Sequence, residues 1–255
     1  MIGYQELSQF PVFSIEQVNQ LTHNQETSRS VLKRLLQKEL IQKIKRNLYS
    51  CVNPATGFVI ASRYQIASAV TETAYISHHT AFEFYGLINQ VYYEVYVSSQ
   101  SKFREFKFDN IVYKYIPSKS QDGVVKPFNH PGVRITDIER TVIDSIQDFS
   151  RIGGLEELLN SLRNVSYLDE EKLRHYLMLY NLKILYQKTG YLLEKLKTVL
   201  NISEEFISFC QSKIGKSSRY LLRDHFDDGR YVKKWRLVVP ERDNISDFDD
   251  GDELV

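Results

Sequence analysis

The side chains best suited to chemistry in this sequence are basic ones that gather near the N-terminus. Between residues 27 and 49 there are seven lysines and arginines against one acid, Glu39. Arg29 and Lys33 are four residues apart and share one face of a helix, with Ser28 beside Arg29 at the helix start. Arginine can pair with guanine through two hydrogen bonds, and lysine can reach guanine or a phosphate. The spacing predicts a helix that presents cations to the major groove of duplex DNA.

A second group of cations follows in a β-rich segment. Lys43, Lys45 and Arg46 cluster at the expected tip of a hairpin, where attraction to phosphates adds affinity without sequence information. The predicted DNA contacts are Ser28, Arg29, Lys33, Arg34, Lys43, Lys45 and Arg46. The alternative is a solvated basic face on a small helical domain that docks an acidic protein, because such domains also serve as protein adaptors.

Two other constellations carry groups that could bind a metal ion. Asp137, Glu139 and Asp144 fall around one helix start and would suit a metal-dependent nuclease, whereas helix capping and an Asp144–Arg140 ion pair explain them structurally. His79 and Glu83 lie one helical turn apart, but the metal-binding string H-E-x-x-H is absent, and a capping or packing role is the favoured interpretation.

No other motif indicates an enzyme. Gly153-Gly154 and Gly190 are not part of a phosphate-binding loop, and Gly190 interrupts a helical stretch, where close packing or a kink would explain it. Cys51 and Cys210 have no catalytic signature and are too few for a disulfide framework. We therefore predict no catalytic residue, no cofactor and no metal.

The N-terminal cations need elements that hold them. Ser14 and Gln17 form a capping box for a helix to about Leu21, and Asn24 caps a second helix to about Lys38. The core side of the second helix is expected to hold Val31, Leu32, Leu35 and Leu36, and the open side Thr27, Ser28, Arg29, Ser30, Lys33, Arg34 and Gln37. The segment 40–52 reads as a hairpin about Arg46-Asn47. Two helices and a hairpin in this order are typical of a winged helix-turn-helix.

The rest of the chain predicts a larger mixed α/β domain, so that the fold class is α+β. A turn cluster around Asn53-Pro54 marks the junction, which gives domains at residues 1–54 and 55–240 and an acidic tail at 241–255. Strands about Asp109-Asn110 suggest an antiparallel sheet, and Thr136 with Glu139 suggests a capping box. Expected helices are 64–70, 77–84, 155–162, 169–180, 184–200 and 203–212, with a terminal strand, 231–239, that contains Trp235.

Composition places the chain among soluble globular proteins. It has 255 residues, 42% apolar side chains and a formal net charge of +1, which argues against indiscriminate binding of polyanions. No apolar run is long enough to cross a membrane, and the first residues lack the pattern of an export signal. A cytoplasmic location is the expectation.

The order of several motifs resembles the AbiEi family of antitoxin transcriptional regulators. The string VLKRLLQKELIQKIKRNLYSCV is similar to the family's recognition helix and wing, with Asn47 where glycine is usual. The segments ISHHTAFEFYGL, ITDIERTVIDSI and QKTGYLLEKL, and the final WRLVV, resemble its later motifs and extend the resemblance over nearly the full chain. The same seven residues, from Ser28 to Arg46, then match the implied DNA contacts.

The resemblance implies an autorepressor that binds inverted repeats in its own promoter. It also implies a C-terminal domain that counteracts a nucleotidyltransferase-like toxin in a type IV toxin–antitoxin system of phage defence, with no stable complex required. Within that domain Arg140 is expected to bridge acids and Thr141 to cap or pack. The competing hypotheses are the metal-dependent nuclease and the protein adaptor.

Overall fold

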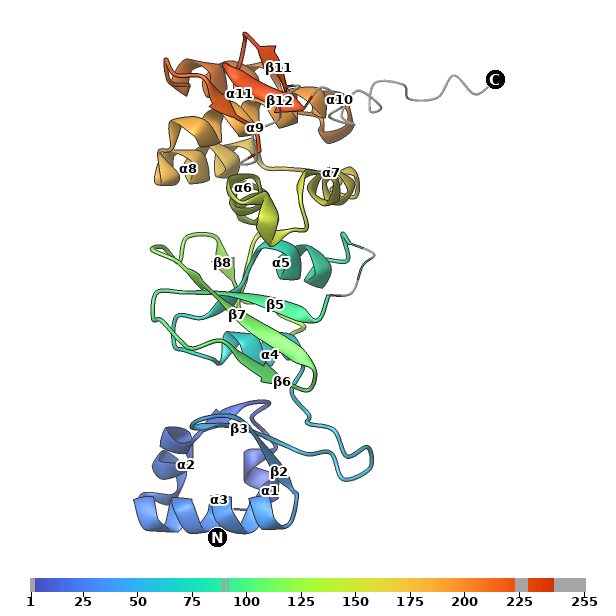
Figure 1. Cartoon of the computed structure of the whole chain (residues 1–255). Coiled ribbons are helices and arrows are strands. Elements are labelled where there is room, and N and C mark those ends of the chain that lie inside the picture. The colour runs from blue at the N-terminus through green and yellow to red at the C-terminus, as the bar shows by residue number, and fades with distance from the viewer. Residues whose placement is uncertain (1–2, 89, 91, 223–228, 241–255) are drawn as a thin grey trace, which may run out of the picture. The chain divides into compact units, whose positions relative to one another are not determined.

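The computed structural model describes residues 3–88, 90, 92–222 and 229–240 and has an α+β fold (Figure 1). Its contacts divide the chain into two compact units, Met1–Thr80 with Tyr92–Thr136, and Ala81–Val91 with Asp137–Val255. The predicted junction at residue 54 lies inside the first unit. The predicted acidic tail, 241–255, lies outside the described residues.

The first unit begins with three helices and a small sheet. The helices are α1 (Tyr4–Leu7), α2 (Ile15–Thr22) and α3 (Gln25–Gln37), and the strands β1 (Phe13–Ser14), β2 (Ile41–Lys45) and β3 (Leu48–Cys51) pair antiparallel in the order β1-β3-β2. The Ser14–Gln17 capping box and the Asn24 cap are both confirmed. Arg46-Asn47 forms the predicted turn, and Asn47 adopts φ 63°, a conformation that asparagine tolerates.

A six-stranded sheet makes up the rest of the first unit. It follows α4 (Arg63–Ser68) and has the order β6-β7-β5-β4-β9-β8. The strands are β4 (Tyr75–Ile76), β5 (Glu94–Ser99), β6 (Phe106–Phe108), β7 (Ile111–Pro117), β8 (Val124–Val125) and β9 (Ile135–Thr136).

The predicted strand pair about Asp109-Asn110 is confirmed as an antiparallel hairpin, but the prediction that the whole sheet is antiparallel is wrong, because β5 pairs parallel with β7 and β4 with β9. The edge strand β6 explains the first parallel pair. It runs antiparallel to β7 through a turn at Asp109-Asn110, whose φ angles of 48° and 62° suit a tight hairpin, so β7 returns in the direction of β5.

The second unit is mainly helical. Helix α5 (His78–Phe84) starts in the first unit and ends in the second. It is followed by α6 (Ile138–Gln147), the 3-10 helix η1 (Phe149–Arg151), α7 (Leu155–Arg163), α8 (Glu170–Tyr180), α9 (Lys183–Lys195), α10 (Lys197–Leu200) and α11 (Glu204–Lys213). Among the residues described, no helix has both the length and the apolar composition that a membrane crossing requires.

A three-stranded sheet ends the second unit. Its strands β10 (Arg219–Tyr220), β11 (Gly229–Val232) and β12 (Leu237–Pro240) have the order β10-β12-β11. The predicted single strand 231–239 is wrong, because residues 233–236 form a turn and Trp235 lies in it. The residues on either side favour strands, so the turn could not be recognised from the sequence. The chain reverses its direction in this turn, where Arg236 adopts φ 51°.

Gly190 on α9 makes room for Trp235. A Cβ atom at Gly190 would lie 2.1 Å from the Trp235 ring, so the prediction that close packing explains this glycine is confirmed. On the same helix, Glu194 accepts a hydrogen bond of 2.6 Å from the indole nitrogen, and Gln187 donates one of 3.0 Å to the Trp235 carbonyl. These contacts fix the turn between β11 and β12 to the core of the second unit.

Candidate nucleic-acid interface

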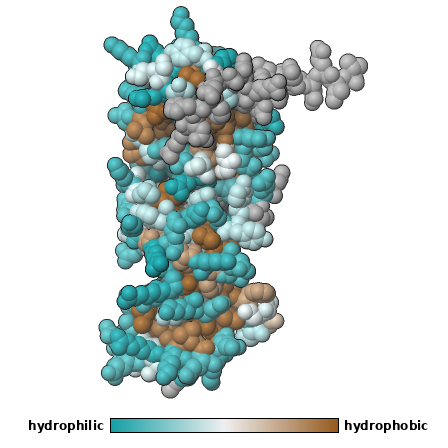
Figure 2. All heavy atoms as spheres, in the orientation of Figure 1, coloured by the Kyte–Doolittle hydropathy of each residue, from teal (hydrophilic) through white to brown (hydrophobic). Residues whose placement is uncertain are grey.

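Helix α3 presents two of the predicted contacts to solvent. Arg29 and Lys33 are exposed, whereas Val31 and Leu35 are buried at 5% and 3% exposure in the core beneath the helix. Figure 2 shows hydrophilic side chains along α3. The helix therefore has one open cationic face, as its sequence period predicts.

Three other residues of α3 depart from the predicted pattern. The prediction that Ser28 lies on the open side is wrong: it is buried, its hydroxyl is 2.5 Å from that of Thr22, and it donates a hydrogen bond of 2.9 Å to the Asn24 carbonyl. Leu36 was assigned to the core but is 37% exposed, and Arg34 is half-buried. Ser28 therefore fastens the start of α3 to the end of α2.

The side chains of the hairpin cations Lys43 and Lys45 lie on opposite faces of the hairpin. Lys43 pairs with Tyr49 and Lys45 with Leu48, so Ile44 has no partner in the register and forms a β-bulge. Neighbouring residues on a strand face opposite sides, so Lys43 shares the face of Tyr49, and Lys45 shares the opposite face with Leu48. Tyr49 belongs to the core that packs against α3. Lys43 is thus exposed at the edge on the α3 side.

Lys45 instead contacts the six-stranded sheet of the same unit. Its ammonium nitrogen lies 5.3 Å from the ring centres of both Phe103 and Phe106. Burial lowers the pKa of Lys45. Lys45 thus lies next to the turn, as predicted, but its side chain rests on the two aromatic rings, while Arg46 in the turn is exposed.

The start of α6 is capped differently from the prediction. Asp137, and not Thr136, is the N-cap, and it accepts a hydrogen bond of 2.8 Å from the Arg140 backbone. The Thr141 hydroxyl donates one of 2.6 Å to the Asp137 carbonyl one turn back, and its side chain is buried, so of the two roles expected of Thr141 it packs and does not cap. Glu139 therefore takes no part in capping α6, and its carboxylate accepts hydrogen bonds from elsewhere in the second unit.

The carboxylates considered for a nuclease are engaged within the second unit. Asp144 forms the predicted ion pair with Arg140, at 3.0 Å, and accepts a hydrogen bond from the Tyr180 hydroxyl. Tyr176 donates one of 2.7 Å to the second oxygen of Asp137, and burial, together with this contact, raises the Tyr176 pKa.

Glu139 accepts hydrogen bonds from the Asp169 backbone at 3.0 Å and from Lys172 at 3.3 Å. Burial alone would lower the pKa of Lys172, but the charges of Glu139 and Asp137 outweigh it and raise this pKa. Within the described residues, no three His, Cys, Asp or Glu side chains converge on a point where a metal ion could bind. The structure does not bring the three acids together as a nuclease would need.

His79 packs in the core, which is one of the two roles predicted for it from the sequence. Its ring is buried and lies edge-on to Tyr92, with 3.8 Å between ring centres. Burial, with the nearby charge of Arg63, lowers the pKa of His79 to about 4. The two cysteines are buried thiols, and burial raises the pKa of Cys51 to about 11 and that of Cys210 to about 12. Both thiols are therefore protonated at neutral pH.

A second concentration of positive charge, not predicted from the sequence, lies in and around β10, β11 and β12. Its signal is present in the sequence, because residues 211–220 and 229–240 contain lysines and arginines but no acid. The two segments are separate in the sequence, and only strand pairing brings them together.

Comparisons with known proteins bear on the fold. No protein-family model matches this chain, and no curated protein matches it. The structure is similar to the crystal structure of the RV2827C protein from Mycobacterium tuberculosis, with a TM-score of 0.61 and 13% sequence identity over 92% of this chain and 89% of that one. At this identity the likeness shows a related fold.

Proposed function

We propose that this chain is a duplex-DNA-binding autorepressor whose first 54 residues form a winged helix-turn-helix. The observation that carries the proposal is the open face of α3, where Arg29 and Lys33 are exposed opposite buried Val31 and Leu35. An α-helix fits the major groove, and long cationic side chains one turn apart can reach base edges and phosphates together.

We propose fewer direct contacts with DNA than the seven residues that the sequence predicts. Arg29 and Lys33 are the proposed base contacts on the helix, and exposed Lys43 and Arg46 are the proposed phosphate contacts on the wing. Half-buried Arg34 lies beside the open face of α3. Ser28 and Lys45 support the interface indirectly, because Ser28 secures the start of α3 and Lys45 rests on the neighbouring sheet. The proposed targets are inverted repeats in the chain's own promoter.

We further propose an antitoxin role for the remainder of the chain, in a type IV toxin–antitoxin system of the AbiEi kind. The support is the succession of family-like motifs from Ile76 to Val239. In the second unit these motifs supply the contacts that hold the fold, including the Arg140–Asp144 pair and the Gly190–Trp235 packing. A cytoplasmic protein that antagonises a nucleotidyltransferase-like toxin without a stable complex fits this assignment.

A DNA-binding measurement tests the repressor role. Fluorescence anisotropy with the duplex upstream of the gene should show specific binding, and Arg29→Ala with Lys33→Ala should weaken it about 100-fold, because each base contact contributes about 1–3 kcal/mol. Lys126→Ala, at an exposed position directly after β8, is the matched control and should bind like the wild type. Undiminished binding by the double variant would eliminate the proposed surface.

A growth assay tests the antitoxin role separately. The neighbouring reading frame should encode a nucleotidyltransferase-like protein that arrests growth when expressed alone. Co-expression of the full chain should restore growth, and Arg29→Ala with Lys33→Ala should preserve this rescue. Failure of the full chain to relieve the arrest would contradict the antitoxin proposal and leave the repressor proposal intact.

A further inference from the structure

The sheet that ends the second unit carries its own concentration of positive charge. Residues 211–220 and 229–240 hold seven basic side chains and no aspartate or glutamate: Lys213, Lys216, Arg219, Arg230, Lys233, Lys234 and Arg236. Lys234 contacts Glu194, whereas Lys213, Lys216, Arg219 and Lys233 have no carboxylate partner in the part of the chain that the structure describes. We call these seven residues the C-terminal basic group.

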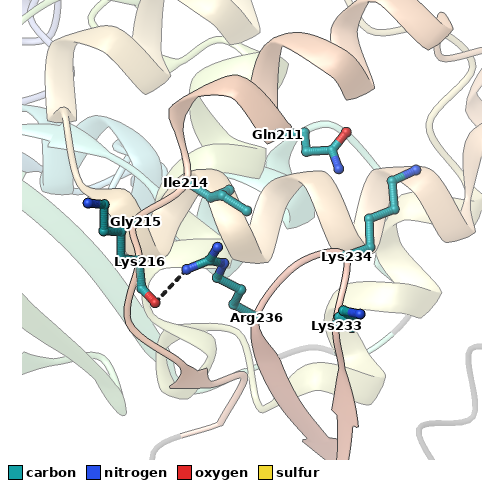
Figure 3. Close-up of a pocket in the computed structure, with 7 residues that line it drawn as sticks. All are labelled: Gln211, Ile214, Gly215, Lys216, Lys233, Lys234 and Arg236. Carbon is teal, nitrogen blue, oxygen red and sulfur yellow. Dashed lines mark hydrogen bonds between the residues drawn. The ribbon is translucent and has the colours of Figure 1, made fainter.

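Four members of this group line a hollow of about 620 Å³ (Figure 3). Its walls are Gln211, Ile214, Gly215 and Lys216 at the end of α11, and Lys233, Lys234 and Arg236 in the turn before β12. The Arg236 guanidinium donates a hydrogen bond of 2.6 Å to the Lys216 carbonyl, which joins the two walls (Figure 3). Like charges around a concave surface concentrate their field and attract an anion such as a phosphate.

Two exposed tyrosines stand in one row of the same sheet. Tyr220 on β10 and Tyr231 on β11 both pair with Val238 on the central strand β12, so all three side chains share one face. The tyrosines are 43% and 50% exposed, whereas Leu237 and Val239, on the opposite face of β12, are fully buried. Two strand spacings separate the tyrosines by about 10 Å. The open face of the sheet is therefore aromatic.

The tyrosine row and the cationic hollow are close together along the chain. The Ser218 hydroxyl donates a hydrogen bond of 3.4 Å to the Tyr231 hydroxyl, and Ser218 lies two residues after Lys216. Tyr231 in turn lies two residues before Lys233. Both walls of the hollow thus continue directly into strands that carry a tyrosine.

We propose that this region binds single-stranded nucleic acid, with phosphates in the hollow and bases stacked on Tyr220 and Tyr231. Aromatic platforms beside cations recognise unpaired strands, because every base has a face that can stack on a ring. A duplex hides those faces, and an acidic polypeptide would use the cations but not the tyrosines. The row of tyrosines is what selects an unpaired strand over other polyanions.

Anisotropy measurements on the full chain test the proposal, with labelled oligo-U and oligo-dT of about ten nucleotides as probes. Tyr220→Ala with Tyr231→Ala should weaken binding at least about 25-fold, that is about five-fold for each base that loses its ring. Tyr220→Phe with Tyr231→Phe keeps both rings and should bind like the wild type. Tyr167→Ala, at a tyrosine that is 68% exposed elsewhere in the unit, is the matched control.

The cations have a distinct readout. Lys216→Ala with Lys233→Ala should reduce the slope of log affinity against log salt by about 1.4, since each phosphate contact to a single strand contributes about 0.7. Preference for oligo-U over oligo-dT would identify RNA as the ligand, and the reverse would identify DNA; either result supports the site.

Three results would overturn the proposal. The first is no binding of either oligonucleotide by the wild-type chain at low salt. The second is a tyrosine-to-alanine variant, folded by circular dichroism, that binds as tightly as the wild type. The third is equal displacement of the probe by polyglutamate, which would mark a site for an acidic protein.

Discussion

Positive charge is concentrated in two regions of this chain that are built differently. The N-terminal cations occur in one continuous window, residues 27–49, on a helix and the hairpin that follows it. The C-terminal basic group comes from two segments that meet only because β10 and β11 both pair with β12. The first region could be recognised from residue spacing, whereas the second depends on strand order, which spacing does not encode.

The two regions also differ in what surrounds the charge. In the N-terminal region Lys45 rests on Phe103 and Phe106, and the nearby Tyr49 is buried. Around the C-terminal group the tyrosines are exposed and most of the lysines lack a carboxylate partner among the residues described. A helix face suits the groove of a duplex, and an aromatic sheet face suits unpaired bases. The two proposals therefore assign different nucleic acids to the two regions.

The largest expected effect comes from disturbing the packing of Trp235, in the turn between β11 and β12, against Gly190 of α9. In Gly190→Ala the new Cβ would lie 2.1 Å from the Trp235 ring, which is fully buried, so the ring or the helix must shift. We expect the second unit to lose about 3 kcal/mol, the upper part of the usual cost of overpacking. Urea unfolding should show the loss, together with weaker binding of single strands and unchanged binding of duplex.

A matched control for this substitution exists in the same unit. Gly215→Ala would place its Cβ 3.4 Å from the Lys183 Cβ, an ordinary contact, and should change stability by less than about 1 kcal/mol. Adding Trp235→Ala to Gly190→Ala should cost less than the sum of the two single changes, because the clash is then relieved. Additive costs would contradict the packing explanation.

We expect acidic pH to lower the stability of the first unit, because of the buried side chain of His79. An unfolded histidine has a pKa of about 6.5, whereas the pKa of buried His79 is lowered to about 4. Above about pH 6.5 the ring is neutral in both states, and as the pH falls toward 4 only the unfolded chain takes up the proton. The first unit should thus lose up to about 3 kcal/mol over this range.

Denaturation curves at neutral pH and near pH 4 measure this loss. His79→Phe keeps a ring against Tyr92 and removes the titrating group, so its stability should depend less on pH over the same interval. If the variant and the wild type lose stability equally on acidification, another group is responsible. The acid effect should weaken the region that carries the N-terminal cations, in contrast to Gly190→Ala, which acts on the other region.

Features encoded within a few residues could be predicted from the sequence. The caps at Ser14 and Asn24, the turn at Arg46-Asn47 and the Arg140–Asp144 pair each depend on side chains close together along the chain. A hydroxyl or amide at a helix start, or opposite charges one turn apart, act whatever the rest of the fold does.

Features decided by distant partners could not be predicted. Ser28 is buried because α2 brings the Thr22 hydroxyl to it, although its position on α3 suggested the open side. The parallel pairing of β5 with β7 follows from where β6 adds to the sheet. Thr136 and Asp137 are adjacent potential caps, and Asp137 takes the role while Glu139 bonds to residues of α8 and its N-cap.

The smallest expected effect is the sharpest test of how the N-terminal cations are arranged. Strict alternation along β2 would give Lys43 and Lys45 the same face and equal roles, but the bulge at Ile44 places them on opposite faces. Lys43→Ala should therefore weaken duplex binding several-fold and reduce the salt slope by about 0.9, the contribution of one phosphate contact.

Lys45→Ala should leave duplex affinity within about two-fold of the wild type and instead cost about 1 kcal/mol of stability, because the ammonium loses its contact with two aromatic rings. Salt titrations of the two single variants, with Lys126→Ala as reference, separate these expectations. Equal losses of affinity would mean that the hairpin presents both lysines to DNA, which requires β2 to move away from Phe103 and Phe106 on binding. Unequal losses in the expected direction would mean that the bulge determines which hairpin cation remains available to a phosphate.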